Sequence, residues 1–94
     1  MNHTITEENY IKPIYHLQYT RDKVSTTLLS DEMKTRPASV TDMLKKLRAK
    51  RIVHYQRYKG FTLTEAGNKT ALVIIRKHRL WEYFLVNKLG FEWD

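Results

Sequence analysis

Apolar residues recur at helical spacing near the start of the chain, between Thr6 and Tyr19. The residues of this apolar face are Tyr10, Ile11, Ile14, Tyr15 and Leu17. Thr4 or Thr6 suits the N-cap of the helix that this pattern predicts. Pro13 lies inside the pattern, where a proline costs roughly 3 kcal/mol. We therefore expect the helix to be kinked near Lys12 or to begin later than the pattern suggests.

Two further helices are predicted in close succession. Ser25 is a good N-cap for TTLLSDEMK, a short segment with one apolar face. Pro37 suits the first position of the next helix, because the N–H that proline lacks would be unpaired there anyway. In PASVTDMLKKLRAK the apolar residues fall at i, i+3, i+4 and i+7, which predicts a single buried face of Val40, Met43, Leu44 and Leu47.

The pattern changes at IVHYQRYKGFTLT, which is rich in β-branched and aromatic residues and holds Lys59-Gly60 at its middle. This composition predicts a β-hairpin. Thr64 then suits the N-cap of a long helix from Glu65 to about Leu89. Its predicted apolar stripe is Ala71, Ile74, Ile75, Trp81 and Leu85, and more apolar residues surround the stripe. Such a helix needs a partner beyond the small core of 94 residues.

These elements predict a fold that is mainly α with a small β-hairpin. Two short helices joined by a tight turn, followed by a hairpin, are the elements of a winged helix-turn-helix. The long helix would then follow the wing.

Positive charge is concentrated in one quarter of the chain. Between Lys34 and Lys59 there are nine Lys and Arg residues against one acid, Asp42, which gives this stretch a charge of +8. The whole chain carries +7, so the other residues sum to −1. Such a cluster is typical of a surface that binds phosphate groups. A solvated basic face that only aids solubility is the alternative.

Composition excludes several classes of protein. The chain has no cysteine, which excludes disulfide frameworks and zinc-thiolate sites. The polar start MNHTITEEN is unlike a signal peptide, and no apolar run approaches the ~18 residues of a membrane span. We expect a cytoplasmic protein without membrane contact. We also expect no enzyme, because the histidines are scattered and adjacent acids such as Glu7 and Glu8 splay apart on a helix.

The helix that begins at Pro37 carries most of the candidate DNA-binding residues. In a recognition helix the N-terminal half contacts base edges, and lysines further along neutralise phosphates. The candidates, which lie opposite or beside the apolar face or just before the helix, are Arg36, Pro37, Ala38, Ser39, Thr41, Asp42, Lys45 and Lys46. Asp42 either accepts a hydrogen bond from a cytosine amino group or is a helix-start charge paired with Lys45 or Lys46.

The predicted hairpin adds a second group of candidates. Arg57, Tyr58 and Lys59 lie at its tip, where a wing can follow the DNA backbone or the minor groove. We expect Tyr55 and Phe61 to belong to the core.

His78 and Glu82 lie four residues apart on the stripe of the long helix that we expect to be buried. A histidine and a carboxylate that both face inward can bind a divalent cation. A hydrogen-bonded His–Glu pair is the alternative, since two donors do not complete a metal site.

Several longer stretches resemble a known family. ENYIKPIYHL, SVTDMLKKL, the junction YKGFTLTEAG and RKHRLWE are similar to the N-terminal part of the diphtheria-toxin-repressor family of iron- and manganese-dependent transcriptional regulators. The resemblance covers about Thr6 to Asp94. It implies a winged helix-turn-helix DNA-binding domain in residues 1–64. In residues 65–94 it implies a long connecting helix and the start of a truncated metal-binding and dimerisation domain.

The resemblance also implies metal ligands. His78 matches the family's ligand histidine, and Glu82 matches the glutamate of the ancillary site in iron-type members. Asn9 matches the first-helix ligand, which is Met in iron-type and Asp in manganese-type members. Lys12 stands where the manganese type has a carboxylate, and a lysine is a poor ligand. Because further family ligands lie C-terminal to this chain, we expect Fe²⁺ or Mn²⁺ in the intact protein and weak or no metal binding here.

The predicted function is a metal-dependent repressor of metal-uptake genes that binds a palindromic operator in double-stranded DNA as a homodimer in its intact form. Two alternatives stay open. One is a protein-interaction winged helix whose binding surface is the apolar part of the long helix, from Ala71 to Val86. The other is a winged helix that binds RNA.

Overall fold

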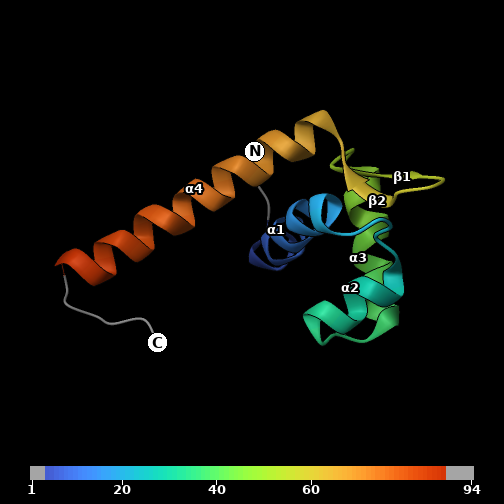
Figure 1. Ribbon diagram of the computed structural model, residues 1–94, viewed down its shortest axis with the longest axis horizontal. Coiled ribbons are helices and arrows are strands. Elements are labelled where there is room, and N and C mark those ends of the chain that lie inside the picture. Colours follow the sequence, from blue (N-terminus) through green and yellow to red (C-terminus); the bar gives the residue numbers. More distant parts are fainter. Residues whose placement is uncertain (1–3, 89–94) are drawn as a thin grey trace.

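The computed structural model describes residues 4–88 (Figure 1). Within them the elements follow in the order α1 (Ile5–Thr20), α2 (Thr26–Met33), α3 (Pro37–Ala49), β1 (Val53–Gln56), β2 (Gly60–Leu63) and α4 (Glu65–Lys88). In Figure 1 the three shorter helices and the hairpin gather at one end of the molecule, and α4 extends away from them. We call residues 4–77 the head and residues 78–88 the distal segment of α4. The predicted winged helix-turn-helix with a long following helix is confirmed.

The first helix starts at a capping box. The Thr4 hydroxyl accepts a hydrogen bond from the Glu7 N–H, and the Glu7 carboxylate accepts one from the Thr4 N–H. Thr4 is therefore the N-cap, and the later start that we expected because of Pro13 is wrong. The helix runs through Pro13 to Thr20, because its buried face on both sides of the proline packs into the core and outweighs the missing hydrogen bond.

The hydrophobic core lies where the three shorter helices meet the hairpin and the first half of α4. It is built from Tyr10, Ile11, Ile14, Leu17, Val24, Leu29, Val40, Leu44, Leu47, Ile52, Val53, Leu63, Ala71 and Ile74. The buried face predicted for α3 is thus confirmed at Val40, Leu44 and Leu47, and Met43 is partly buried beside it. The first half of the stripe predicted for α4 is confirmed as well. The second half is not buried, since Trp81 is 59% exposed in the distal segment.

The hairpin pairs β1 with β2 antiparallel, with Val53 opposite Leu63 and Gln56 opposite Gly60. The turn end of β2 is tied to the segment before α2, because the Val24 N–H donates to Lys59 O and the Phe61 N–H donates to Val24 O. Gly60 has φ of 74°, and a Cβ atom there would lie 2.1 Å from Val24 O. Only glycine fits this close approach with a positive φ.

The last helix begins at Glu65 and is capped as predicted by Thr64, whose hydroxyl accepts a hydrogen bond of 3.0 Å from the Gly67 N–H. Leu89, at the predicted end of this helix, lies outside the described residues. In residues 4–88 we find no helix with the length and apolarity that a membrane crossing requires.

Candidate nucleic-acid interface and metal-ligand positions

The side of α3 that faces away from the core carries the predicted DNA-binding residues. Those predicted from α3 and from the residue before it, Arg36, Pro37, Ala38, Ser39, Thr41, Asp42, Lys45 and Lys46, are all exposed. Val40, Leu44 and Leu47 on the opposite side are at most 2% exposed. The helix therefore presents small and polar groups on its N-terminal half and lysines on its C-terminal half.

Hydrogen bonds within the chain fix the turn that places α3 after α2. Ser25 caps α2 by accepting a hydrogen bond of 3.0 Å from the Leu28 N–H. Lys34 ends α2 with a left-handed φ of 53°. The Thr35 N–H then donates to Ser30 O, and the Ser30 hydroxyl donates to Thr35 O. The turn was expected, but its left-handed residue could not be predicted, because this position is usually Gly or Asn and here it is Lys34.

The tip of the hairpin presents the second group of candidates. Arg57, Tyr58 and Lys59 connect the two strands and are all exposed. The Arg57 guanidinium lies 5.4 Å from the centre of the Tyr58 ring, which is a cation–π distance. In Figure 1 this tip projects beyond the rest of the head. The wing therefore offers two cations and one aromatic ring to a partner.

Two interpretations of single residues are wrong. Asp42 is not a helix-start charge, because the first turn of α3 contains no acid, and no ion pair within residues 4–88 includes Asp42. Tyr55 is 48% exposed rather than part of the core. Its ring packs edge-on against Phe61, with 5.1 Å between ring centres, and Phe61 is partly buried against the core. No element within residues 4–88 covers the outer face of the hairpin, which explains the exposure of Tyr55.

The candidate metal ligands lie on two different helices. His78 and Glu82 lie on α4, and Asn9 lies on α1. We expected His78 and Glu82 to be buried, but His78 is only partly buried and Glu82 is exposed. The reason is that α4 continues past the head, so no described element covers its distal segment. Asn9 is exposed as well.

These donors do not complete a metal site. Nowhere in residues 4–88 do three or more His, Cys, Asp or Glu side chains come together in a way that could hold an ion. One imidazole and one carboxylate at i and i+4 supply two ligands, whereas divalent cations of this type need four to six. Glu8, an acid close to Asn9 on α1, forms an ion pair with Lys77, the residue before His78. A full site would need donors from outside the described residues.

Comparison with known proteins gives two adjoining matches to one family. Residues 3–61 match the model of the iron dependent repressor N-terminal DNA binding domain. Residues 64–94 match the iron dependent repressor metal binding and dimerisation domain. The first match ends inside β2, and the second begins at Thr64, just before α4.

Individual relatives agree with these matches. The chain is 37% identical over 86 residues to an uncharacterized HTH-type transcriptional regulator of Methanocaldococcus jannaschii, covering 90% of this chain and 69% of the relative. It is 33% identical over 82 residues to the HTH-type transcriptional regulator MntR of Oceanobacillus iheyensis, covering 87% of this chain and 56% of that protein.

A solved structure also matches closely. The crystal structure of ScaR with bound Zn²⁺ superposes with a TM-score of 0.84 at 36% identity, over 92% of this chain and 40% of ScaR. The chain thus spans between two fifths and about two thirds of the length of these proteins. Both domain matches and the individual relatives lead to one conclusion: the chain belongs to the iron-dependent repressor family.

Proposed function

We propose that the head binds double-stranded DNA and is the DNA-binding domain of a metal-dependent transcriptional repressor. The observation that carries this proposal is the division of α3 into a buried apolar side and an exposed side of small, polar and basic residues. Such a helix fits the major groove with one side while the other side holds it to the head.

Each group of exposed residues has its own proposed role. Ser39, Thr41 and Asp42 contact base edges, because they can exchange hydrogen bonds with the groove. Lys45 and Lys46 neutralise phosphates on the C-terminal half of α3. At the wing tip Arg57 and Lys59 bind the backbone or the minor groove beside it.

The properties of the whole repressor are proposals as well. The name of the second matched domain supports a homodimer. The exposed apolar side chains of the distal segment, such as Leu80, Trp81 and Phe84, suit such contacts. A homodimer would bind a palindromic operator. His78 and Glu82 would supply two ligands to Fe²⁺ or Mn²⁺, and a bound divalent cation would add positive charge between helices. We propose no catalytic activity, and we place the repressor in the cytoplasm with its DNA.

Charge reversal tests the proposal. We expect the variant Lys45→Glu/Lys46→Glu to lose most duplex binding, measured by fluorescence anisotropy with a labelled duplex. The matched control, Arg76→Glu/Arg79→Glu, changes the net charge equally on exposed residues of α4. It should keep at least half of the affinity. Equal losses in both variants would show that only total charge matters, and this would contradict a reading face on α3.

The same measurement separates the alternatives. A protein-interaction module would keep its partner binding in the Lys45→Glu/Lys46→Glu variant and lose it when Trp81 and Phe84 are replaced by serine. A winged helix for RNA would prefer an RNA duplex or single strand over the DNA duplex in direct competition.

A further inference from the structure

Two neighbouring acids at the start of α1 make ion pairs with residues of two other elements. Glu7 binds Lys50, the residue that follows α3, with 2.7 Å between Glu7 Oε2 and Lys50 Nζ. Glu8 binds Lys77 of α4, with 2.9 Å between Glu8 Oε1 and Lys77 Nζ. Adjacent side chains on a helix point about 100° apart. One turn of α1 therefore reaches both α3 and α4.

The Glu7 carboxylate is the more buried member of this arrangement, at 2% exposure. Its Oε1 accepts hydrogen bonds of 2.9 Å from the Lys50 ammonium and from the Thr4 N–H. The hydrogen bond from Lys50, helped by that from Thr4, holds the pKa of Glu7 below its ordinary value. A buried carboxylate without such partners is strongly unfavourable. Lys50 therefore has an internal partner, whereas the ion pairs within residues 4–88 include neither Lys45 nor Lys46.

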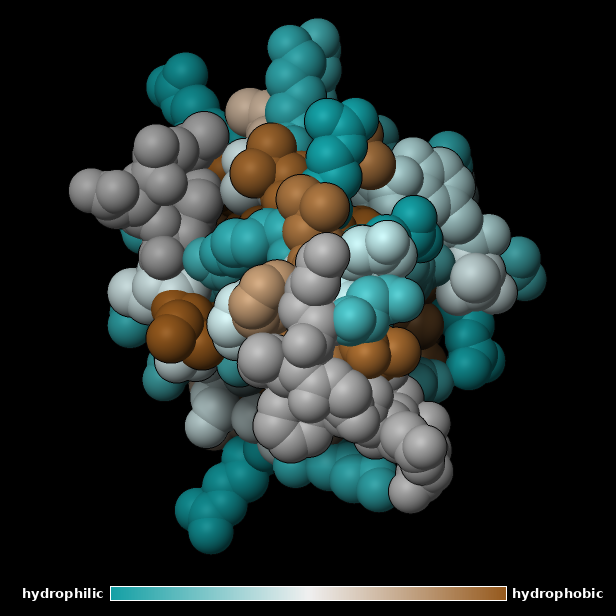
Figure 2. Space-filling view, turned by 90° about the vertical axis from the view of Figure 1, so that its left-hand side faces the viewer, coloured by the Kyte–Doolittle hydropathy of each residue, from teal (hydrophilic) through white to brown (hydrophobic). Residues whose placement is uncertain are grey.

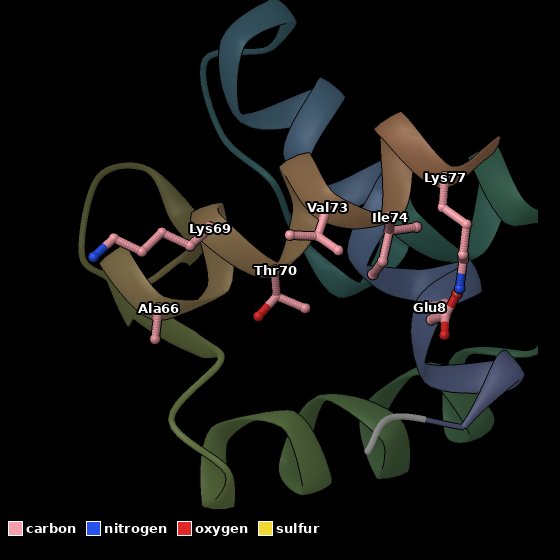
Figure 3. A pocket seen from close by; sticks show the side chains of 7 residues that line it. All are labelled: Glu8, Ala66, Lys69, Thr70, Val73, Ile74 and Lys77. Carbon is pink, nitrogen blue, oxygen red and sulfur yellow. The ribbon is translucent and has the colours of Figure 1, made fainter. Parts of the chain in front are cut away.

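Both ion pairs lie beside surface hollows between helices. One hollow, between the start of α1 and the end of α3, is lined by Thr4, Met43 and Ala49 together with Glu7 and Lys50. The other lies along α4 and is lined by residues such as Thr70 and Val73 together with Glu8 and Lys77. Figure 3 shows Lys77 and Glu8 reaching toward each other at one end of this second hollow. Each ion pair therefore links two helices at the edge of a hollow, in addition to the core packing of α1 against α3 and α4.

We propose that the first turn of α1 is a junction that fixes the end of α3 and the course of α4 to one another. Glu7, Lys50, Glu8 and Lys77 are then positioning residues for the exposed face of α3. Lys50 belongs to the basic cluster of the sequence, but it holds α3 to α1 and does not contact phosphate. As long as both ion pairs are intact, a movement of α4 carries the first turn of α1 with it and so reaches α3. The consequence for DNA binding rests on the proposed function, whereas the junction itself does not.

The orientation of the helices can be measured without DNA. Residual dipolar couplings of backbone N–H groups report the angles between α1, α3 and α4 in the full chain. Glu7→Gln keeps one oxygen as an acceptor for the Thr4 N–H, removes the charge and replaces the other carboxylate oxygen by an NH2 group. We expect it to change the angle between α1 and α3, or to shrink the couplings of residues 47–50, while α4 stays in place. Glu8→Gln is the matched control. We expect it to change the angle between α1 and α4 and to leave the angle between α1 and α3 unchanged.

The second measurement is binding to a DNA duplex that has been selected from a random-sequence pool with the wild-type chain. Removing an acid raises the net charge, which by itself would tighten DNA binding. We expect Glu7→Gln to weaken it about fivefold, the lower end of coupling between sites. Lys50→Met should weaken binding similarly and leave its salt dependence unchanged. Lys46→Met should instead bring the slope of log association constant against log salt concentration closer to zero by about 0.9. Lys50→Arg should restore binding, and the double variant Glu7→Gln/Lys50→Met should be no worse than either single variant.

The outcomes separate the junction from the proposed function. Unchanged helix angles in both Glu7→Gln and Glu8→Gln would overturn the junction. A reduced salt slope in Lys50→Met would mean that Lys50 contacts phosphate, which would also overturn it. If the unchanged chain selects no duplex, the proposed function fails, and the helix angles alone decide the junction.

Discussion

The head and the distal segment of α4 contain similar apolar residues, but the two regions treat them differently. In the head Ile14, Val40 and Leu47 are completely buried. In the distal segment Leu80 is 69% exposed, and Trp81 and Phe84 stack on each other in the open, with 5.5 Å between ring centres. The difference shows that apolar content predicted the helix in both regions but predicted burial only where other elements surround it.

This contrast assigns a separate role to each region. The head has a closed core and turns fixed by hydrogen bonds, so it can hold α3 in one orientation. The distal segment has an open apolar surface (Figure 2), which is typical of a contact site for another protein surface. The proposed reading of DNA thus belongs to the closed region, and the proposed dimer contact belongs to the open one.

Alanine at a core leucine and at a distal leucine should give the largest contrast. We expect Leu47→Ala to lower the free energy of unfolding by about 2–5 kcal/mol, because it leaves a cavity in the core. Leu80→Ala should change it by less than about 0.5 kcal/mol, because the side chain is exposed. Urea denaturation followed by circular dichroism measures both. Similar losses in the two variants would mean that the distal segment is packed in solution.

A smaller effect is expected at Gly60, where the wing contacts the segment before α2. Gly60→Ala introduces a Cβ atom against Val24 O at a positive φ. We expect a loss of about 1–3 kcal/mol from this strain. Thermal unfolding measures the loss, and NMR shifts of Val24 should report detachment of the hairpin. Lys59→Ala at the exposed tip is the control and should have little effect. Full stability in Gly60→Ala would contradict the observed contact.

The weakest of the expected effects is the binding of a metal ion to the distal segment. With only His78 and Glu82 as donors, we expect Mn²⁺ to bind weakly, in the millimolar range, as for sites with few charged ligands. Paramagnetic broadening by Mn²⁺ should affect the His78 resonances before those of His54, an exposed histidine on β1. His78→Ala should remove the effect. Equal broadening at both histidines, or tight binding, would contradict this account of the donors.

Periodicity predicted the elements of the head well. The spacing of Val40, Leu44 and Leu47 predicted both the buried and the exposed side of α3, because helical geometry alone relates the two. The caps at Ser25 and Thr64 could be predicted because a hydroxyl before an apolar run has few other roles.

Contacts between distant parts of the chain could not be predicted in this way. Glu7 and Glu8 splay apart as expected, but their partners lie 43 and 69 residues away. No local pattern marks Lys50 as the partner of a buried acid among so many exposed cations. The expected burial of His78 and Glu82 failed for a related reason, because the phase of a helix does not reveal where its neighbours end.

The salt dependence of duplex binding by the unchanged chain tests the central claim most directly. If Arg36, Lys45, Lys46, Arg57 and Lys59 neutralise phosphates, the logarithm of the association constant should fall with the logarithm of salt concentration with a slope of about −4.5. Removal of Lys46 should bring the slope closer to zero by about 0.9, and removal of Arg79 on α4 should not change it. Flat affinity between low and physiological salt would contradict the claim that the head binds DNA.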